Sequence, residues 1–527
     1  MNTGKKLTYA DLTTDETIHT GYEEALEKIQ PELGSSHPII IGGNEFFPGP
    51  GFEVFSPVDR RIVLGTWSAA TPLQVTCAIT TSRDGFPAWR DRDWRERAGI
   101  IRKTADILES QHFLLAALIT LESGKNRFEA LAEVGETVDM LRYHAEIYTK
   151  QEGFVTLTRP ESRGAESRIV LRPYGVWAVI SPFNFPLSLA AGMAGAALIT
   201  GNTIVLKPTG TAPFSGLKLF QAFTAAGVPP GSIQYITGPG AMFGDVVTAH
   251  QDTAGIAFTG SRAAGMWLHR AFAARQRCIK PVIFEMGSKN PVIVTEHADL
   301  DKAAEGIYRS AFGFSGQKCS AASRVYVHES VAGRFITMLR SQVEGLVIGD
   351  PRKKETFTGP LINPEAVQRF RESVALARKD GGRIVTGGDV LDGGIYSEGQ
   401  YARPALVTGL TRGHPLFRQE LFVPLLLIDP YKTLPEALGE ANATEYGLTA
   451  GIFSENDEEL ASFFTAIQSG VTYANRRAGA TTGAWPGTQS FGGWKGSGST
   501  GKGIGGPYYL LSYLQEQAQT RIRQGFP

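Results

Sequence analysis

Cysteine is scarce in this chain of 527 residues, which contains only Cys77, Cys278 and Cys319. Three cysteines cannot build the disulfide framework of a small secreted domain, and no group of cysteines and histidines has the spacing of a zinc site. Because free thiols are typical of reducing surroundings, we expect a cytoplasmic protein without a structural metal.

An excess of charge of either sign is also missing. Lysine and arginine together number 52, and aspartate and glutamate together number 52. A balanced chain has no overall field that would attract nucleic acid or an anionic membrane surface. The composition is ordinary for a globular enzyme that acts on a small molecule.

A secretory leader and a clear membrane span are both lacking. The first 17 residues carry acidic side chains early and contain no apolar core. Residues 173–206 contain no charged side chain and are long enough to cross a bilayer. This stretch is interrupted, however, by Pro182, Asn184, Pro186, Gly201 and Asn202. We therefore predict a buried strand, a turn, a helix and a second strand there, and no contact with a membrane.

What is present is a regular pattern of helices and strands, in a chain long enough for two or three domains. Residues 72–148 are predicted to be mostly helical, because apolar residues such as Leu131, Val134 and Val138 recur at helical spacing. From Ile169 onward, short β-rich runs alternate with helices, and a second unit of this kind is predicted to start near Pro281 with the strand PVIFE. Such alternation predicts parallel sheets with helices on both faces.

The turn FTGSRAAG (258–265) follows a predicted strand and precedes a predicted helix. Sheets of this kind bind nucleotides at the carboxyl ends of their strands, where a helix N-terminus can hold a phosphate. Gly260 and Gly265 could also form an ordinary tight turn, but their context favours a nucleotide site.

Cys319 lies in GFSGQKCSAASR (313–324), among small residues rather than the large apolar residues that usually surround a buried cysteine. The preceding Gly316 and Lys318 suggest close backbone approach and a nearby positive charge. Both features favour a thiolate, so we expect Cys319 to be reactive.

Four segments place a reactive side chain just after a strand or in a loop: SPFNFP with Asn184, FEMGSK with Glu285, SGQKCS with Cys319 and QELFVP with Glu420. Each side chain also has a simpler explanation. Asn184 could cap the helix that follows it, Glu285 could be a solvated strand end, Cys319 could belong to the core, and Glu420 could be a surface charge.

Taken together with GNTIVLKP and FTGS, these segments resemble the aldehyde dehydrogenase superfamily over nearly the whole chain. The resemblance implies an α/β fold with a Rossmann-like NAD(P)-binding domain, an α/β catalytic domain and a small β oligomerisation arm, and hence a homodimer or larger homo-oligomer. The predicted division is 1–148 and 169–280 for the cofactor-binding domain, 281–490 for the catalytic domain, 149–168 for an oligomerisation hairpin, and 491–527 for a return segment and oligomerisation tail.

The resemblance also implies a chemistry that explains these residue types. Carbonyl carbon has no transferable hydride until a nucleophile adds to it, and a thiolate is a suitable nucleophile that later leaves from a thioester. Cys319 would attack the aldehyde, and the Asn184 amide and the Cys319 backbone N–H would bind the resulting oxyanion. Glu285 would activate water for hydrolysis of the thioester to a free acid.

For the cofactor, the resemblance implies that Lys207 binds the adenosine ribose, Ser261 the pyrophosphate, and Glu420 with Phe422 the nicotinamide ribose. Ser181, Pro182 and Gly260 belong to the same expected site. One position departs from the pattern: Gly210 in KPTG stands where many relatives have an acid that grips the ribose hydroxyls and repels a 2′-phosphate. We therefore expect dual or NADP-leaning use of NAD and NADP.

Within the superfamily, the chain most resembles the pyrroline-carboxylate (glutamate semialdehyde) dehydrogenase branch, through HPIIIGG, ESGKNRFEALAEVGE (122–136), FGFSGQKCSAASR, TGA (482–484) and FGG…GGPYYL. The resemblance implies that the amino-carboxylate head of the substrate is held by Ser320, Gly483 and Ala484, whose exposed N–H groups would form an anion nest. Glu129, Phe185 and Phe491 are the other expected substrate contacts.

The anchor loop departs from the branch, because RAGAT (477–481) makes it about three residues longer than usual. Aromatic residues near the site could equally line a tunnel for an aromatic or longer aliphatic aldehyde. Two other functions remain open: a catalytically silent homologue that serves as a structural or binding protein, and a thiol hydrolase. The hydrolase requires a histidine base, and none follows Cys319 before His328.

Overall fold

The computed structural model describes residues 16–49, 51–161, 164–477 and 485–522. Its N-terminal part is helical, as expected for 72–148, because the apolar faces of the helices pack into one buried cluster. Leu131, Val134 and Val138 all lie in that cluster. The helices are α1 (Glu16–Ile29), α2 (Pro72–Arg90), α3 (Trp94–Ser110), α4 (His112–Ser123) and α5 (Arg127–Lys150).

The first large sheet has the strand order β12-β11-β8-β9-β10-β2-β3. The five strands from β12 to β10 are parallel, and β2 and β3 add an antiparallel hairpin at one edge. The strands are β2 (Ile39–Ile41), β3 (Asn44–Phe46), β8 (Val176–Ile180), β9 (Thr203–Lys207), β10 (Ile233–Tyr235), β11 (Thr253–Thr259) and β12 (Val282–Glu285). In chain order the parallel strands run 5-4-1-2-3, which is the doubly wound order of nucleotide-binding sheets.

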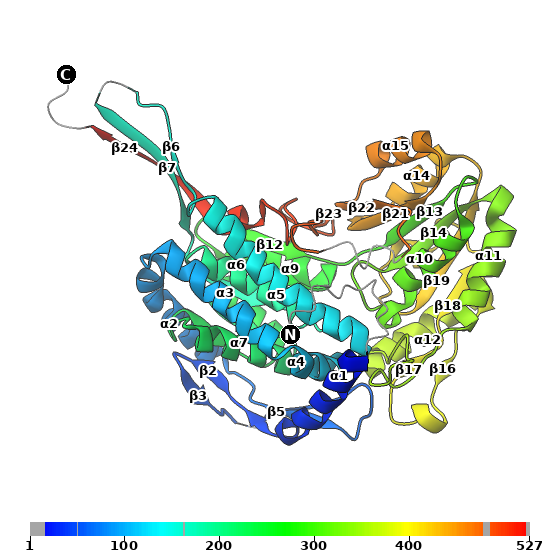
Figure 1. The fold of residues 1–527 in the computed structure, drawn as a ribbon, viewed down its shortest axis with the longest axis horizontal. Coiled ribbons are helices and arrows are strands. Elements are labelled where there is room, and N and C mark those ends of the chain that lie inside the picture. Colours follow the sequence, from blue (N-terminus) through cyan, green and yellow to red (C-terminus); the bar gives the residue numbers. More distant parts are fainter. Residues whose placement is uncertain (1–15, 50, 162–163, 478–484, 523–527) are drawn as a thin grey trace.

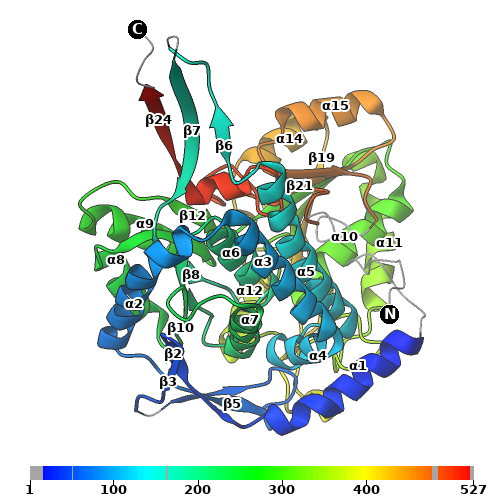
Figure 2. The same cartoon turned by 60° about the vertical axis from the view of Figure 1, so that its left-hand side comes forward.

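Helices cover both faces of this sheet (Figures 1 and 2). Val176 and Ala178 of β8 point into the core beneath α2, α8 and α9, whereas Trp177 and Val179 point into the core shared with α3 to α7. This alternation follows from the two-residue period of a strand, and burial on both faces explains the continuous apolar run VWAVI. The added helices are α6 (Ser188–Ile199), α7 (Pro213–Ala226), α8 (Gly240–Ala249) and α9 (Arg262–Arg275).

The strand at 282–285 belongs to this first sheet and not to the second unit, so our assignment of PVIFE was wrong. Val282 to Glu285 pair in parallel with Ile256 to Thr259 of β11. The second sheet begins only at Asn290, after a link of four residues (286–289) that follows β12. The sequence of a strand does not reveal its partner, because pairing is decided by distant parts of the chain.

The second sheet has the order β15-β18-β19-β14-β13-β21-β22, in which all pairs except β15–β18 are parallel. The core on one face contains side chains of α10 and α11, and the core on the other contains side chains of α12, α14 and α15. The strands are β13 (Asn290–Val294), β14 (Ala322–His328), β15 (Arg383–Thr386), β18 (Ala405–Thr408), β19 (Leu425–Tyr431), β21 (Thr449–Phe453) and β22 (Val471–Ala474). The helices are α10 (Leu300–Phe312), α11 (Glu329–Glu344), α12 (Pro364–Lys379), α13 (Pro415–Arg418), α14 (Leu434–Asn442) and α15 (Asp457–Ala466).

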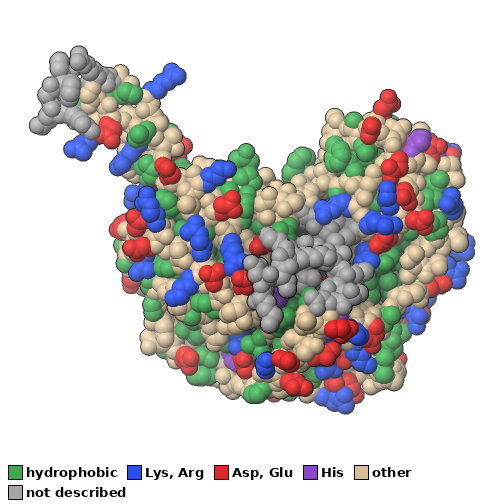
Figure 3. Space-filling model, viewed as in Figure 1, with side chains coloured by type: hydrophobic (Ala, Val, Ile, Leu, Met, Phe, Trp, Pro, Cys, Tyr) green, Lys and Arg blue, Asp and Glu red, His purple; other side chains and the backbone are tan. Residues whose placement is uncertain are grey.

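A three-stranded antiparallel arm projects from the body (Figures 1 and 3). It consists of β6 (Val155–Leu157), β7 (Ala165–Pro173) and β24 (Leu514–Ile522). β7 pairs with β24 along its whole length, from Ala165 opposite Ile522 to Pro173 opposite Leu514. Two chain segments more than 300 residues apart thus form one element. α5 continues to Lys150 and β7 to Pro173, beyond the limits of 149 and 168 expected from the sequence.

The uncharged stretch 173–206 folds as predicted, into β8, a turn, α6 and β9. Within the described ranges, no helix is both long and apolar enough to cross a membrane. The remaining short strands form three small sheets: β1 (Ser36–His37), β4 (Phe52–Phe55) and β5 (Val63–Trp67); β16 (Val390–Leu391) and β17 (Tyr401–Ala402); β20 (Tyr446–Gly447) and β23 (Trp494–Lys495).

Candidate active site

The carboxyl ends of the first sheet carry several of the residues predicted to bind a dinucleotide. From β8, the chain adds β9 and β10 on one side and then β11 and β12 on the other, so the strand order reverses between β8 and β11. Ligands of doubly wound sheets bind in the crevice at this point. Ser181 and Pro182 directly follow β8, Gly260 and Ser261 directly follow β11, and Lys207 is the last residue of β9. The topology therefore brings these residues to one edge of the sheet.

Ser181 and Lys207 have unused hydrogen-bonding capacity at this edge. The Ser181 N–H donates to the Lys207 carbonyl at 3.2 Å, but the buried Ser181 hydroxyl has no partner within the described chain. Lys207 Nζ donates to the Pro208 carbonyl at 3.1 Å, and burial lowers its pKa to about 8. Since an ammonium has three donors, these two side chains suit a polar ligand such as a ribose.

Ser261 caps the helix that faces the crevice. Its hydroxyl accepts from the Ala264 N–H at 3.3 Å, at the start of α9. The Gly260 N–H donates to the Glu285 carbonyl at 3.1 Å, and a Cβ on Gly260 would lie 2.5 Å from the Phe258 ring. The glycine is therefore required for this close turn, and the first N–H groups of α9 suit a phosphate.

Gly210 leaves open space beside Lys207. A Cβ at this position would have Phe52 Cε2, 3.7 Å away, as its nearest contact. Position 210 carries no acidic side chain, although the structure has space for a Cβ atom there.

The segment that leads to Cys319 is held in an unusual conformation. Phe314, Ser315 and Gly316 have φ values of 50°, 54° and 69°, which is the left-handed region for three residues in succession. The Ser315 N–H donates to Thr358 Oγ1 at 2.7 Å, which anchors the turn. Non-glycine residues in this region are strained, and such strain often marks a functional site.

Asn290 fixes the other side of the same turn. Its Nδ2 group donates to the Cys319 carbonyl at 2.8 Å and to the Ala321 carbonyl at 2.9 Å. Its Oδ1 atom accepts from the Thr449 N–H at 3.0 Å. The first residue of β13 therefore sets the backbone of Cys319. Asn290 was not predicted as a site residue, because an asparagine beside MGSK has no local feature that reveals so distant a partner.

In the part of the chain that the structure describes, Lys318 does not bring its positive charge to the Cys319 thiol, so this prediction was wrong. Lys318 turns its ammonium away to the carboxylate of Glu129. Burial, together with the carboxylates of Glu285, Glu420 and Glu136, raises the pKa of the half-buried Cys319 thiol to about 12. Adjacent residues in a loop point in different directions, which explains why the sequence neighbour is not the spatial neighbour.

Glu285 is a buried carboxyl at the end of β12. Its Oε1 atom accepts from the Gly493 N–H at 3.2 Å, and its Oε2 atom has no partner among the described residues. Burial raises the pKa of Glu285 to about 8, and the Gly493 bond opposes this rise. The carboxyl is thus not a solvated strand end, and its pKa near neutrality suits a general base.

Glu420 is held against the link between the two sheets. Its Oε1 atom accepts from the Ser288 N–H at 2.7 Å, and burial raises its pKa to about 7. A Cβ on Gly287 would lie 2.3 Å from Glu420 Oε2, so that glycine is what allows the approach. Glu420 is therefore not a surface charge.

Asn184 lies buried in the loop between β8 and α6, and it does not cap the helix. Leu187 occupies the cap position. The rings of Phe183 and Phe422 are 6.0 Å apart, and those of Phe183 and Phe314 are 6.5 Å apart. The loops of Asn184, Cys319 and Glu420 thus meet through three phenylalanines.

The residues predicted to contact substrate have different surroundings from one another. Ser320 is buried beside Cys319, and Phe491 belongs to the buried core cluster against which the partly buried Phe185 packs. Glu129 binds Lys318, as described above. Gly483 and Ala484 lie outside the described residues.

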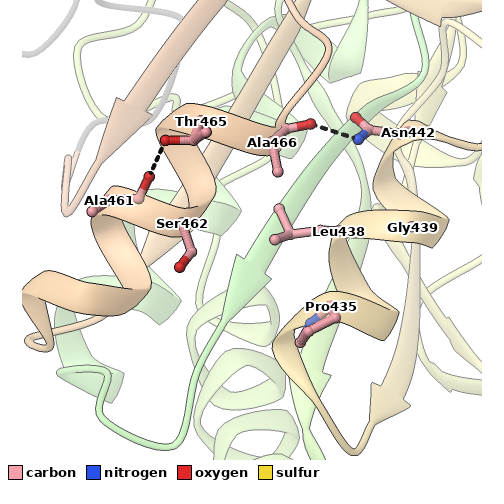
Figure 4. Close-up of a pocket in the computed structure, with 8 residues that line it drawn as sticks. All are labelled: Pro435, Leu438, Gly439, Asn442, Ala461, Ser462, Thr465 and Ala466. Atoms are coloured by element: carbon pink, nitrogen blue, oxygen red, sulfur yellow. Dashed lines mark hydrogen bonds between the residues drawn. The ribbon is translucent and has the colours of Figure 1, made fainter.

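A shallow groove lies elsewhere, between α14 and α15 (Figure 4). Its lining contains none of the predicted site residues and consists of Pro435, Leu438, Gly439, Asn442, Ala461, Ser462, Thr465 and Ala466. It has no buried charged group, so we do not regard it as a catalytic site.

A family model and several known proteins match most of this chain. Residues 48–518 match the family described as "Aldehyde dehydrogenase family". A 1-pyrroline-5-carboxylate dehydrogenase from Halalkalibacterium halodurans is 36% identical over 98% of this chain and 98% of its own length.

Two solved structures are also similar, each with a TM-score of 0.92. The first, 1-pyrroline-5-carboxylate dehydrogenase from Thermus with bound NAD, is 31% identical over 97% of this chain and 98% of that chain. The second, proline utilization A from Bdellovibrio bacteriovorus, is 34% identical over 97% of this chain, which spans 53% of that longer protein. With a family match over most of its length and relatives above 30% identity, this chain belongs to the aldehyde dehydrogenase family.

Proposed function

We propose that this protein oxidises glutamate semialdehyde to glutamate, with Cys319 as the nucleophile, Glu285 as the base and a nicotinamide dinucleotide as the hydride acceptor. The observation that carries the proposal is the position of Cys319 within electrostatic reach of Glu285, beside a doubly wound sheet with the crevice of a dinucleotide site. The names of the relatives support the choice of aldehyde.

In this proposal, a base first removes the Cys319 proton, the thiolate sulfur then adds to the aldehyde carbon, and the electron pair of the carbonyl π bond moves to its oxygen, which gains negative charge. The Asn184 amide and the Cys319 N–H would donate to that oxygen. Donors of this kind contribute about 2.7–4 kcal/mol each in comparable sites. The bond from Asn290 to the Cys319 carbonyl would hold the backbone donor in place.

Glu285 would take a proton from the water that hydrolyses the thioester. Its burial and its single bond to Gly493 leave Oε2 free of protein partners among the described residues, as a base requires. Because a base must be deprotonated, its raised pKa makes it a stronger base that is fully active only at alkaline pH.

NAD or NADP would bind along the crevice, and it supplies the hydride acceptor when bound. Ser181, Pro182 and Lys207 would meet the adenosine ribose side, Gly260 and Ser261 the pyrophosphate, and Glu420 with Phe422 the nicotinamide ribose. We further propose dual or NADP-leaning use, since the open space at Gly210 would admit a 2′-phosphate.

Ser320, Phe185 and Phe491, with Gly483 and Ala484, would contact the substrate. A second candidate substrate is an aromatic or longer aliphatic aldehyde. The contact among Phe183, Phe314 and Phe422 beside the nucleophile loop favours it, because such rings suit an apolar chain.

A substrate screen tests the proposal. Purified protein is mixed with NAD or NADP and with glutamate semialdehyde, succinic semialdehyde, benzaldehyde or hexanal, and the absorbance of reduced cofactor is followed. We expect the highest kcat/KM with glutamate semialdehyde, and no turnover by Cys319→Ser, which should still bind the cofactor. Preference for benzaldehyde or hexanal would support the second candidate, and no reduction with any aldehyde would indicate a catalytically silent homologue.

We also propose a homodimer or larger homo-oligomer in a reducing compartment such as the cytoplasm. β6 and β24 are both edge strands of the arm, and Val155, Leu157 and Ile522 on them are 43%, 74% and 54% exposed. Unpaired edges and exposed apolar side chains are typical of an association surface. Cys77 and Cys278 are exposed free thiols, which fits a reducing environment.

A further inference from the structure

Lys125, just before the cap of α5, and Glu129 and Glu133, in the first two turns of that helix, are three buried charged side chains near the two loops of the candidate active site. Lys125 and Glu133 are fully buried, and Glu129 is almost so. Buried charges are rare unless they are paired and have a structural or functional role. The mechanism above assigns no role to Lys125 or Glu133.

Glu133 takes the place of an N-cap side chain for α6. Its Oε1 atom accepts from the N–H groups of Leu187 and Ser188, at 2.9 and 3.2 Å. Leu187, at the cap position, has no side-chain acceptor of its own. These two N–H groups follow Asn184 by three and four residues, so Glu133 fixes the end of the loop that carries the asparagine.

Lys125 holds Glu133 in place and contacts both loops. Its Nζ atom donates to Glu133 Oε2 at 2.5 Å. The same ammonium lies 3.5 Å from the centre of the Phe185 ring, next to Asn184, and 5.3 Å from the centre of the Phe314 ring, in the nucleophile loop. Such cation–π contacts are strongest where water is excluded, as it is here.

Glu129, one turn before Glu133, holds the nucleophile loop from the same helix. It pairs with Lys318, the residue before Cys319. One helix therefore binds the Asn184 loop through Glu133 and the Cys319 loop through Glu129. The spacing of four residues places both carboxylates on one side of α5.

We propose that Glu133 is a positioning residue that sets the Asn184 amide relative to Cys319, and that Lys125 orients its carboxylate. This inference rests on the proposed role of Asn184 as an oxyanion donor. Small displacements of a catalytic donor can reduce turnover about a hundredfold. Loss of the acceptor at Glu133 should therefore lower kcat, while binding of the cofactor by Lys207 and Ser261, which lie outside the Asn184 loop, should change less.

Two double variants separate the acceptor from the charge. Lys125→Met with Glu133→Gln removes both charges but keeps an oxygen that can accept from Leu187 and Ser188. Lys125→Met with Glu133→Leu removes both charges and the acceptor. Neither leaves an unpaired buried charge, so both should fold. We expect kcat within about threefold of wild type for the first, and about ten- to a hundredfold lower for the second.

Glu122→Leu is the matched control. Glu122 is a fully buried glutamate on α4 that accepts from the N–H groups of Phe214 and Ser215 at the start of α7, just as Glu133 does for α6. The Glu122→Leu substitution should lower Tm about as much as the double variant Lys125→Met with Glu133→Leu does, while kcat at saturating cofactor stays unchanged. An equal loss of kcat in both would mean general destabilisation and would overturn the proposal.

Two further readouts do not depend on the identity of the aldehyde. Hydrolysis of p-nitrophenyl acetate passes through an oxyanion. Its rate should therefore decrease in the double variant Lys125→Met with Glu133→Leu by about the same factor as kcat does. Alkylation of Cys319 by iodoacetamide forms no oxyanion, so its rate, followed by peptide mass spectrometry, should stay unchanged. If wild type hydrolyses the ester but oxidises no aldehyde, the proposed function fails and the positioning role is still tested. An unchanged ester rate in the Glu133→Leu variant, or no ester hydrolysis by wild type, would overturn the positioning role.

Discussion

At the scale of single residues, the site is dominated by carboxyl groups. Glu285, Glu420 and Glu136 all raise the pKa of Cys319, and the one nearby lysine in the sequence pairs elsewhere. A thiol in such surroundings stays protonated at neutral pH until a positive charge enters the crevice or a base takes its proton. The oxidised nicotinamide ring carries such a charge, so reactivity of Cys319 should depend on the bound cofactor.

The raised pKa of Glu285 predicts a pH dependence for turnover. A pKa of about 8 means that the carboxylate, which is the active form of a base, increases as pH rises from about 7 to 9. We expect kcat to rise through this range and then level off, and Glu285→Gln to lower kcat about 10²- to 10⁴-fold and to abolish the inflection. Steady-state rates at saturating substrate between pH 6 and 10 measure this. A wild-type profile that is flat across that range would contradict the assignment of Glu285 as the base.

The open space at Gly210 predicts a switch in cofactor preference. Gly210→Glu should fit without a clash and should repel a 2′-phosphate, so we expect at least a tenfold fall in the ratio of kcat/KM for NADP to that for NAD. Gly210→Gln, which has the same size without the charge, is the control and should change the ratio much less. An equal effect of both substitutions would mean that size, not charge, determines the choice.

At the scale of elements, the sequence predicted local structure better than the pairing of distant parts. The periodicity of 72–148 and the strand–helix alternation from Ile169 are confirmed, because both depend on short-range burial patterns. The sheet to which β12 belongs was predicted wrongly, since its partner is set by tertiary contacts. The site followed the same rule: motifs indicated Cys319 and Glu285, whereas Asn290, Gly493 and Glu133 became visible only through contacts that span at least 29 residues of sequence.

The cap of α7 predicts a pH effect on stability. Burial raises the pKa of Glu122 to about 7, above its ordinary value of 4.5. The folded state therefore binds this proton more tightly than the unfolded state does, so the contribution of Glu122 to stability decreases as pH rises from about 4.5 to 7. We expect the difference in Tm between wild type and Glu122→Gln to become less favourable to wild type over that range. Thermal melts at pH 5 and pH 7.5 measure it, and a difference independent of pH would refute the assignment.

At the scale of the whole molecule, the two sheets contribute different parts of the candidate site. The carboxyl ends of the first sheet carry the proposed cofactor residues and Glu285, and the start of the second sheet carries Asn290, which binds the nucleophile turn. The short link 286–289 between β12 and β13 also binds Glu420, so small shifts between the sheets would act directly on the site. The arm projects from the body of the molecule (Figure 3).

Removal of β24 should change the oligomeric state. A chain that ends after Tyr513 lacks β24, and it would leave β7 without one of its two neighbours. We expect wild type to be a dimer or larger and the truncated chain to be smaller, by light scattering coupled to size exclusion. A chain that ends after Ile522 keeps β24 complete and is the control. Wild-type protein that is monomeric at micromolar concentration would contradict the proposed role of the arm.

The central claim is that Cys319 forms a covalent acyl intermediate that Glu285 helps to hydrolyse. The most direct measurement uses Glu285→Gln, mixed rapidly with oxidised cofactor and glutamate semialdehyde, with absorbance and peptide mass spectrometry as readouts. We predict one equivalent of reduced cofactor per active site, followed by slow turnover, and an acyl group on the peptide that contains Cys319. Steady turnover without a burst, or an acyl group on another residue, would contradict the account.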